Sequence, residues 1–388
     1  MSQFDFMDKL LDGVEVEFKP LGGLAENLDS MRKPIMSGLR ESGEIPYYGA
    51  SGVVDHVKDY IFDGDFLLVS EDGANLIARN TPIAFSISGK SWVNNHAHIL
   101  KFRTYVERRF VDIYLNSIDL TPYISGAAQP KLNQKNLNSI KIPIPCPDNP
   151  EKSLEIQAEI VRILDTFTEL TTELTTELTA RKKQYEYYRD QLLGFEEGEV
   201  EWRALGTLAA NLDSMRKPIN SGLRELGEIP YYGASGVVDY VKGYIFDGDF
   251  LLVSEDGANL LARNTPIAFS ISGKNWVNNH AHVLKFNTYA ERRYVEYYLN
   301  SIDLTPYISG AAQPKLNKKN LNSISIPNPS PEEKERIVAI LNKFDTLTTS
   351  ISEGLPREIK LRQQQYEYYR DLLLSFPKPE ELKLMAGA

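Results

Sequence analysis

The sequence predicts an α+β protein in which two similar globular domains are separated by two long helices that pair antiparallel as a coiled coil, with a pseudo-two-fold axis relating the halves. Three observations predict this fold. The chain contains a long internal repeat, and each copy carries short strand patterns followed by a helix pattern. Each copy is then followed by a segment with heptad spacing of apolar residues.

The internal repeat covers residues 15–147 and 199–331, which align without a gap and differ at 21 positions. Two copies are too few for a solenoid, in which at least three are usual. A repeat of this length therefore predicts two complete domains with one fold. Because nearly every residue is shared, identity between the copies cannot single out functional residues.

Each copy begins with strand patterns and continues with a helix pattern. In the first copy, apolar runs at 45–49, 59–73, 81–90 and 91–102 are separated by Gly, Asp and Asn turn signals. A helix pattern follows at 107–119, and the second copy repeats this order. The pattern predicts an α+β body, or a mostly β body with its helices on one side.

The segments after the two copies predict long helices. Residues 154–193 contain no Gly or Pro and keep heptad spacing, which predicts a helix of about 40 residues or about 60 Å. In the second segment, Gly354 and Pro356 predict a break or kink. We expect the two segments to pack antiparallel, because a lone amphipathic helix is marginally stable in water. The expected pairing residues are Leu164, Leu174, Leu178, Tyr185, Tyr188, Leu341, Leu355, Tyr366 and Tyr369.

These patterns divide the chain into six parts, because Pro-rich stretches separate each body from its helix. The expected parts are an N-terminal segment at 1–14, a first domain at 15–147, a central long helix at 148–198, a second domain at 199–331, a C-terminal long helix at 332–376 and a tail at 377–388.

The composition places the protein among soluble proteins of a reducing compartment. Cys146 is the only cysteine, which excludes an internal disulfide framework. No apolar run is long enough to span a membrane, and the start of the chain does not resemble a signal peptide. We therefore expect a cytoplasmic protein.

The net charge of −10 is concentrated in the central helix. Residues 148–200 have a net charge of −7, whereas residues 17–147 have 0 and residues 201–331 have +1. The two bodies are therefore neutral, which leaves room for a local basic face despite the acidic total.

A search for catalytic motifs finds none. The sequence has no phosphate-binding loop, dinucleotide fingerprint, nucleophile elbow or adenine-methylating tetrapeptide. The acidic cluster of Asp63, Asp65, Glu71 and Asp72 lacks a nearby lysine to complete a nuclease pattern, and Asp-Gly steps favour turns. We therefore expect no catalytic residue in this chain.

His96 and His98, repeated as His280 and His282, raise the alternative of a metal site. On a strand, alternate residues share a face, so the two imidazoles could bind one metal ion. No third ligand follows at a convincing spacing, so we expect no metal and assign these histidines to packing or polar recognition.

The remaining polar residues suit DNA binding. Arg and Lys bind phosphates, Asn and His can hydrogen-bond base edges, and aromatic rings add contact surface. The candidate DNA-binding residues of the first copy are Arg32, Lys33, Tyr47, Tyr48, Ser51, Arg79, Lys90, Trp92, Asn94, Asn95 and His96. Their counterparts in the second copy are Arg216, Lys217, Tyr231, Tyr232, Ser235, Arg263, Lys274, Trp276, Asn278, Asn279 and His280.

Two longer stretches resemble a known family. The stretch SGAAQPKLNQKNLNSIKIPIP is followed by a long helix that ends in RKKQYEYYRDQLLGF, and both recur in the second half of the chain. Together with the TEL-TTEL-TTEL segment at 168–178, this pattern resembles the specificity (S) subunit of type I restriction–modification systems. The resemblance covers essentially the whole chain.

The resemblance implies a division of labour among subunits. The S subunit reads double-stranded DNA through two target-recognition domains and is not itself catalytic. Two modification (M) subunits dock on its helices, bind S-adenosylmethionine and methylate adenine, and restriction (R) subunits add ATP- and Mg-dependent cleavage. One departure matters, since family members commonly carry two dissimilar recognition domains. Here the copies are nearly the same, which predicts a bipartite and palindromic or nearly palindromic site.

Two further interpretations from other classes stay open at this point. The two heads could belong to a tandem binding or scaffold protein that grips a repeated protein or glycan. The chain could also be a metal-dependent enzyme that uses His96 and His98. Steep loss of binding with added salt would favour DNA over the scaffold ligand.

Overall fold

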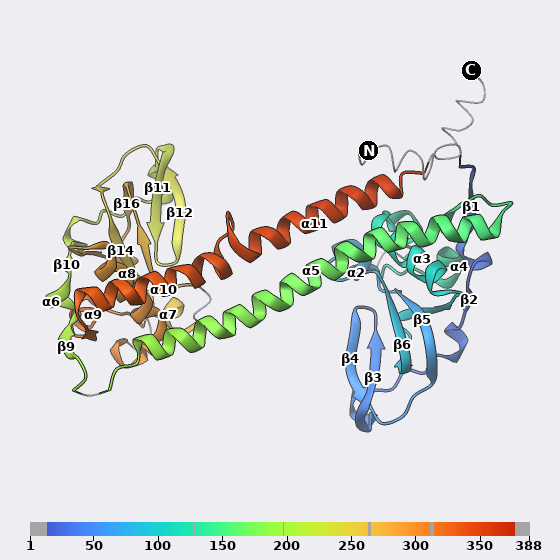
Figure 1. The fold of residues 1–388 in the computed structure, drawn as a ribbon, viewed down its shortest axis with the longest axis horizontal. Coiled ribbons are helices and arrows are strands. Elements are labelled where there is room, and N and C mark those ends of the chain that lie inside the picture. The colour runs from blue at the N-terminus through green and yellow to red at the C-terminus, as the bar shows by residue number, and fades with distance from the viewer. Residues whose placement is uncertain (1–13, 127–128, 197, 263–264, 311–313, 377–388) are drawn as a thin grey trace, which may run out of the picture. The chain divides into compact units, whose positions relative to one another are not determined.

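The computed structural model describes residues 14–126, 129–196, 198–262, 265–310 and 314–376. The chain divides into two compact units. The first unit runs to residue 173 and resumes at residue 360, and the second unit comprises residues 174–359. Each unit therefore contains one globular domain, one part of the central helix and one part of the C-terminal helical segment (Figure 1).

The first domain is built on a six-stranded sheet. Its strands, in spatial order, are β2 (Glu26–Asn27), β7 (Ala97–Lys101), β5 (Phe62–Ser70), β6 (Ala84–Val93), β3 (Ser42–Gly49) and β4 (Gly52–Val57). All neighbours are antiparallel except β3 and β6, which are parallel. In β5, predicted as an apolar run, Phe62, Phe66 and Leu68 belong to a core on one face of the sheet.

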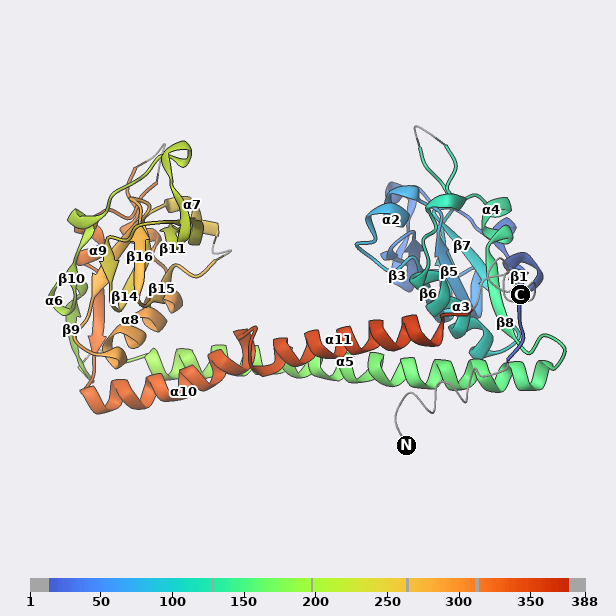
Figure 2. The ribbon, with the colours of Figure 1, turned by 90° about the horizontal axis from the view of Figure 1, so that it is seen from above.

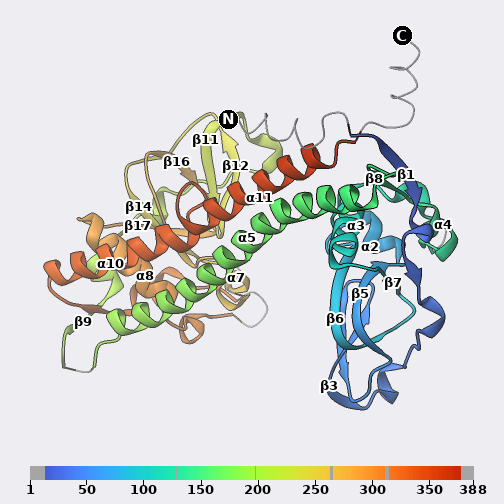
Figure 3. The ribbon, with the colours of Figure 1, turned by 45° about the vertical axis from the view of Figure 1, so that its right-hand side comes forward.

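A helical layer covers the sheet and faces the central helix. The helix α3 (Tyr105–Ser117) begins at a capping box in which Thr104 and Glu107 satisfy each other's backbone N–H groups. It packs on β5 and β6 and lies between the sheet and the long helix α5 (Figures 1 and 3). The remaining elements are β1 (Val16–Pro20) paired with β8 (Lys141–Pro145), and the short helices α2 (Gly73–Ala78) and α4 (Gln134–Ser139).

The second domain repeats the strand pairings of the first, but its shorter strands form two four-stranded sheets in place of one six-stranded sheet. Residues 248–249 separate β13 (Phe246–Asp247) from β14 (Phe250–Ser254) where the first domain has the single strand β5, although Gly64 within β5 has nearly the same φ as Gly248, 143° against 137°. The other strands are β9 (Glu201–Ala204), β10 (Ala210–Asn211), β11 (Leu226–Gly233), β12 (Gly236–Val241), β15 (Ala268–Ile271), β16 (Lys274–Val277), β17 (Ala281–Lys285) and β18 (Ser325–Asn328). The helices are α6 (Leu205–Leu208), α7 (Gly257–Ala262), α8 (Tyr289–Ser301) and α9 (Lys318–Asn322).

The two long segments form helices that pair antiparallel within each unit. The central helix α5 spans Pro150–Leu193, and the C-terminal segment forms α10 (Pro331–Thr349) and α11 (Gly354–Leu373). In the first unit, Phe167 stacks on Tyr369, whereas the earlier residue Leu164 shares a core with the later Leu373. In the second unit, Tyr185 contacts Phe344, and Leu193 shares a core with Ile337. The predicted antiparallel pairing is confirmed.

The burial of the expected pairing residues is uneven. Leu164 and Leu341 are fully buried, as predicted. Tyr188 is 41% exposed, which corrects its assignment to a buried seam, although its ring stacks on Phe344. A pair of helices covers only one flank of each, so side chains beside the seam stay partly open. The half-buried members are Leu174, Leu178, Tyr185, Leu355, Tyr366 and Tyr369.

The C-terminal segment is broken where the sequence predicts a break. Residues 350–353 separate α10 from α11, and Gly354 has a φ of 76°. The single helix expected at 332–376 is therefore two helices. No helix in the described part of the chain is long and apolar enough to cross a lipid bilayer.

Candidate nucleic-acid interface

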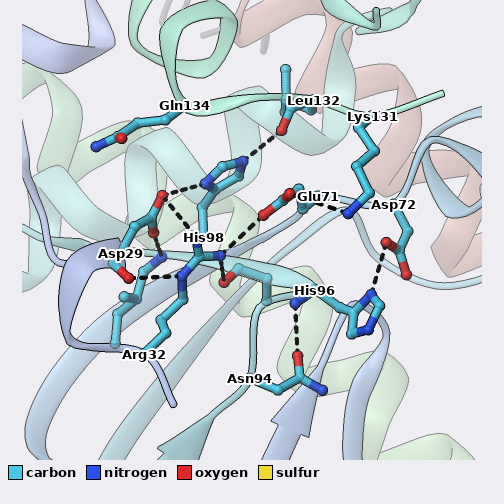
Figure 4. Close-up of polar contacts among 12 residues, drawn as sticks. Asp29, Arg32, Glu71, Asp72, Asn94, His96, His98, Lys131, Leu132 and Gln134 are labelled. Carbon is cyan, nitrogen blue, oxygen red and sulfur yellow. Dashed lines mark hydrogen bonds and ion pairs between the residues drawn. The ribbon is translucent and has the colours of Figure 1, made fainter. Parts of the chain in front are cut away.

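A polar network centred on Asp29 joins four segments of the first domain (Figure 4). It links the short 3-10 helix at Asp29–Met31, the residues after β5, the start of β7 and the loop before α4. The element α2, which follows β5, lies on the side of the first unit away from α5 (Figure 2). We call this set of Asp29, Arg32, Glu71, His98 and Lys131 the Asp29 network.

His98 is the most deeply buried side chain of the network. Its side chain is 1% exposed, and its Nδ1 lies 2.6 Å from Asp29 Oδ2. Its Nε2 lies 2.6 Å from the carbonyl oxygen of Leu132. Both ring nitrogens therefore face oxygen atoms, so the imidazole links the Asp29 carboxylate to the backbone carbonyl of Leu132.

Asp29 is the carboxylate of the network that faces His98. Its Oδ1 accepts a hydrogen bond of 3.0 Å from the backbone N–H of Ile99. Burial opposes ionisation, but the hydrogen bond and charge of His98, then Ile99 and Arg32, outweigh burial and hold the pKa of Asp29 below its ordinary value. The carboxylate thus stays ionised and ties the short 3-10 helix to β7.

Arg32 is a structural member of the network rather than a free cation. Its Nη1 donates to the carbonyl oxygen of Ala97 at 2.8 Å and lies 3.1 Å from Glu71 Oε2. Its side chain is 14% exposed. The guanidinium therefore fixes the loop that follows it, and little of its surface remains for a ligand.

Lys33, the next residue, turns to solvent. The Trp92 indole Nε1 donates to the Lys33 carbonyl oxygen at 2.5 Å, which holds this backbone against β6. Within the described residues, no carboxylate forms an ion pair with Lys33. Lys33 thus places an exposed positive charge on a fixed backbone, which suits a phosphate contact.

The turn between β6 and β7 adds polar groups to the same region. Asn94 is buried, and its Oδ1 accepts from the backbone N–H of His96 at 2.8 Å. Asn95 and His96 are exposed, and His96 Nδ1 lies 3.0 Å from Asp72 Oδ1. Asn94 therefore shapes the turn, while Asn95 and His96 present side chains that can hydrogen-bond a ligand.

The second domain repeats this arrangement nearly atom for atom. His282 Nδ1 lies 2.6 Å from Asp213 Oδ2, and Arg216 Nη1 donates to the Ala281 carbonyl oxygen at 2.8 Å. Trp276 Nε1 donates to the Lys217 carbonyl oxygen at 2.5 Å. The same causes lower the pKa of Asp213, namely His282, Val283 and Arg216 acting against burial. Lys217, Asn279 and His280 are again exposed around it.

The aromatic candidates at 47 and 231 are buried. Tyr47 and Tyr231 are each 1% exposed, and the Tyr47 hydroxyl accepts from the backbone N–H of Ile35 at 2.9 Å. Their position in the core leaves no surface for DNA, because the apolar face of β3 and β11 packs inward. Tyr48 and Tyr232 are half-buried, and their rings contact Phe85 and Phe269.

Other candidates are exposed or bound elsewhere in the domain. Arg79 donates to the carbonyl oxygens of Asn116 and Ile118, so it joins α2 to the end of α3. Lys90 and Lys274 lie over the rings of Tyr60 and Tyr244. Ser51 and Ser235 are exposed at the turns after β3 and β11. Arg263 lies outside the described residues.

The two histidines of the His-Ala-His motif do not share a face. β7 begins at Ala97, so His96 lies in the preceding turn and His98 points into the buried network. The local turn breaks the alternation on which the metal-site alternative depended. Among the described residues, no group of three or more His, Cys, Asp or Glu side chains is placed to hold a metal ion.

Lys131 and Lys315 are site residues that the sequence patterns did not single out. Lys131 Nζ lies 3.4 Å from Glu71 Oε1, and the side chain is 38% exposed. The backbone of Lys131 forms an isolated antiparallel β-bridge with the backbone of Asp72. The Pro-Lys-Leu-Asn stretch that contains it supported only the family resemblance. The presence of a basic residue in that repeated loop was the available signal.

Both halves of the chain match one family model. The model is described as the type I restriction modification DNA specificity domain, and it matches residues 13–182 and again residues 198–361. The matches together cover most of the chain and follow the internal repeat.

Two specificity subunits from bacteria align with nearly the whole chain. A putative type I restriction enzyme specificity subunit from Haemophilus influenzae is 36% identical over 398 residues, covering 96% of this chain and 98% of that protein. The specificity subunit of the type I restriction enzymes EcoR124I and EcoR124II from Escherichia coli is 36% identical over 414 residues, covering 98% and 99%.

Solved structures agree in fold. The S subunit of a type I restriction–modification system from Mycoplasma genitalium superposes with a TM-score of 0.63, covering 95% of this chain and 98% of that one at 14% identity. A chain from a study of complex assembly in a type I restriction–modification system superposes with a TM-score of 0.55 at 14% identity, covering 92% and 97%.

Proposed function

Because this chain belongs to the type I restriction–modification DNA specificity family, we propose that it reads a bipartite, nearly palindromic DNA site for a type I complex and has no catalytic role itself. The observation that carries the proposal is the repeated match to a DNA specificity domain, together with two nearly identical sets of exposed polar residues around the Asp29 and Asp213 networks.

Within each domain, the exposed residues divide by chemistry. Lys33 and Lys217 bind phosphates, together with the half-exposed Lys131 and Lys315. These phosphate contacts fix the register of the domain on the duplex. Asn95 and His96, with Asn279 and His280, hydrogen-bond base edges. Arg32, Arg216, Asn94 and Asn278 hold the backbone that presents these groups.

The near identity of the two domains determines the form of the site. Two similar domains that are related by a two-fold axis and bind one duplex read the same half-site on opposite strands. The site therefore consists of a few specific base pairs, a non-specific gap and the reverse complement. His56 of β4 and its counterpart Tyr240 of β12 are exposed and differ, so this difference perturbs the reading of one half-site at most.

The catalytic chemistry resides in partner subunits. Two M subunits dock on α5, α10 and α11 and bind S-adenosylmethionine, and R subunits join through the complex and use ATP and Mg. The complex works in the cytoplasm, where its DNA lies. The alternative of a scaffold for a repeated protein or glycan is not favoured, since the matched family is a DNA specificity family.

The experiment that tests this function selects DNA from a random duplex library with the chain bound to the M subunits of its own system. We expect an enriched motif in two halves, and binding that weakens steeply with salt. The chain alone, incubated with S-adenosylmethionine, should neither methylate nor cut DNA. Failure to enrich any motif, or methyl transfer by the chain alone, would contradict the proposal.

A further inference from the structure

The surface that joins each domain to its helices differs between the units far more than the Asp29 and Asp213 networks do. We call this surface the seat of the domain. The corresponding helix residues are identified by the shared Ile-Val pairs, Ile160-Val161 of α5 and Ile337-Val338 of α10, which are buried in their units. In this alignment, Asp165 of α5 corresponds to Asn342 of α10, Thr168 corresponds to Asp345, and Gln157 corresponds to Lys334.

In the first seat, one arginine binds one aspartate of the central helix. Arg109 Nε lies 2.7 Å from Asp165 Oδ1, and Arg109 Nη1 lies 2.9 Å from Asp112 Oδ2. The Tyr105 hydroxyl donates to Asp165 Oδ2 at 2.9 Å. An open cavity of about 670 Å³ borders these residues. Asp165 thus anchors α3 to α5 through two residues of the domain.

In the second seat, the carboxylate lies one helical turn further along. Arg293 Nη2 lies 3.0 Å from Asp345 Oδ2, and its Nε and Nη2 donate to Asn342 Oδ1 at 3.3 and 3.2 Å. Tyr297, which stands where the first domain has Ile113, donates to Asn342 Oδ1 at 2.8 Å. Asp112 is likewise replaced by the longer Glu296, which pairs with Arg293.

A second set of matched differences surrounds Lys334. This lysine is 6% exposed, and its Nζ lies 3.3 Å from Glu291 Oε1 and donates to Asn328 Oδ1 at 2.6 Å. It also lies over the ring of Tyr294, 5.8 Å from the centroid. Asn328 and Tyr294 stand where the first domain has Ile144 and Phe110. The replacement of Ile144 by Asn328 supplies an oxygen for the ammonium group, whereas Phe110 and Tyr294 both offer an aromatic ring at their position.

The first seat has the opposite set. Gln157 is 5% exposed and donates to Ser153 Oγ at 3.1 Å. It borders a cavity of about 330 Å³ together with Ile144 and Arg103. Arg103 is replaced in the second domain by the neutral Asn287, so the positive charge is present on the domain in one seat and on the helix in the other.

We infer that these matched sets make each recognition domain specific for its own helix segment. The two domains, although nearly identical where they face DNA, are therefore not interchangeable between their seats. A buried lysine needs its oxygen partners, and a buried arginine needs its carboxylate within reach. The matched residues are positioning residues: they set how the domain sits on the helix pair and contact no DNA.

The seating itself does not depend on the proposed function. One consequence of the seating does rest on the proposed function. The DNA-facing residues of one domain can replace those of the other only if the seat residues stay with the helix that they match. A failure of the seating test would therefore leave DNA recognition untouched, and the reverse also holds.

The test replaces residues 15–147 by the sequence of residues 199–331 in the full chain. We expect the exchange to lower the midpoint of thermal unfolding by roughly 3–8 °C and to speed hydrogen exchange in α5 residues 150–173. Adding Gln157→Lys, Asp165→Asn and Thr168→Asp should restore both. As a matched control, the same three substitutions in the parent chain should destabilise it.

A smaller cycle tests the lysine set if the exchanged chain does not fold. Asn328→Ile should destabilise the second unit because Lys334 loses its closest partner, and Asn328→Ile with Lys334→Gln should recover most of the loss. In the first unit, Gln157→Lys should destabilise and the added Ile144→Asn should rescue. Strictly additive effects in both cycles, or an exchanged chain as stable as its parent, would overturn the specificity of each domain for its own helix segment.

Discussion

The indole Nε1 of Trp92 donates a hydrogen bond of 2.5 Å to the carbonyl oxygen of Lys33, and Trp276 and Lys217 repeat the contact at 2.5 Å. The bond fixes the backbone of a lysine whose side chain remains exposed. Each domain therefore holds a positive charge at a defined place, beside the turn that carries Asn95 and His96 in the first domain.

The first prediction concerns these two lysines. Replacing both Lys33 and Lys217 by Ala should weaken binding of the assembled complex to its DNA and reduce the salt dependence, because each phosphate contact contributes a slope of about −0.9. Fluorescence anisotropy at several salt concentrations measures both effects. The slope should change by about 2, and Lys→Arg at both positions should preserve it. An unchanged slope in the double alanine variant would rule out phosphate contacts here.

The second prediction concerns acid. The pKa of Asp29 lies below its ordinary value of about 3.9, so its stabilising contribution is complete above that pH and is lost as the pH falls through the folded-state pKa. Asp213 behaves in the same way. Urea unfolding between pH 3 and pH 6 should show stability falling below about pH 4. Asp29→Asn with Asp213→Asn should flatten that fall, and an equally steep fall in the double variant would contradict the assignment.

The third prediction separates buried from half-buried residues of α5. Leu164 is fully buried against the first domain, whereas Leu174 is half-buried. Leu164→Ala should cost about 2–5 kcal/mol of unfolding free energy, and Leu174→Ala clearly less, because less apolar surface and a smaller cavity are involved. Denaturant unfolding of the full chain measures both. Equal losses would show that the middle of α5 is as deeply buried as its start.

The fourth prediction concerns the length of the central helix. Deleting residues 171–174 removes one Thr-Thr-Glu-Leu unit, which shortens α5 by about 6 Å and rotates the remaining C-terminal part of the helix by about 40°. One base pair of DNA corresponds to about 3.4 Å and roughly 35°. The gap between the half-sites should therefore shorten by one or two base pairs with both half-sites unchanged. A gap of the original length would refute the helix as a ruler.

Much of the fold could be predicted from the sequence. The internal repeat, the antiparallel pairing of the helices and the break before Gly354 all follow from patterns along the chain. Tyr188 shows the limit of such patterns, because heptad spacing does not tell how many helices cover a seam. With one partner helix, Tyr188 stays 41% exposed.

The candidate site was predictable only by residue type. Arg32 and Lys33 are neighbours of similar chemistry, yet Arg32 is held by Glu71, 39 residues away in sequence, whereas Trp92 contacts only the backbone of Lys33, whose side chain stays exposed. Lys131 lies 60 residues from Glu71 in sequence and joins the network only through the fold. The seat differences at Asn342 and Asp345 resemble ordinary variation in the sequence, and only the fold shows that they share an arginine partner.

The most direct test of the central claim maps methylated adenines in DNA exposed to this chain together with its M subunits. The near identity of the Asp29 and Asp213 networks predicts one motif made of two half-sites that are reverse complements, or nearly so, separated by a non-specific gap. Two unrelated half-sites would contradict the claim that both domains read DNA in the same way.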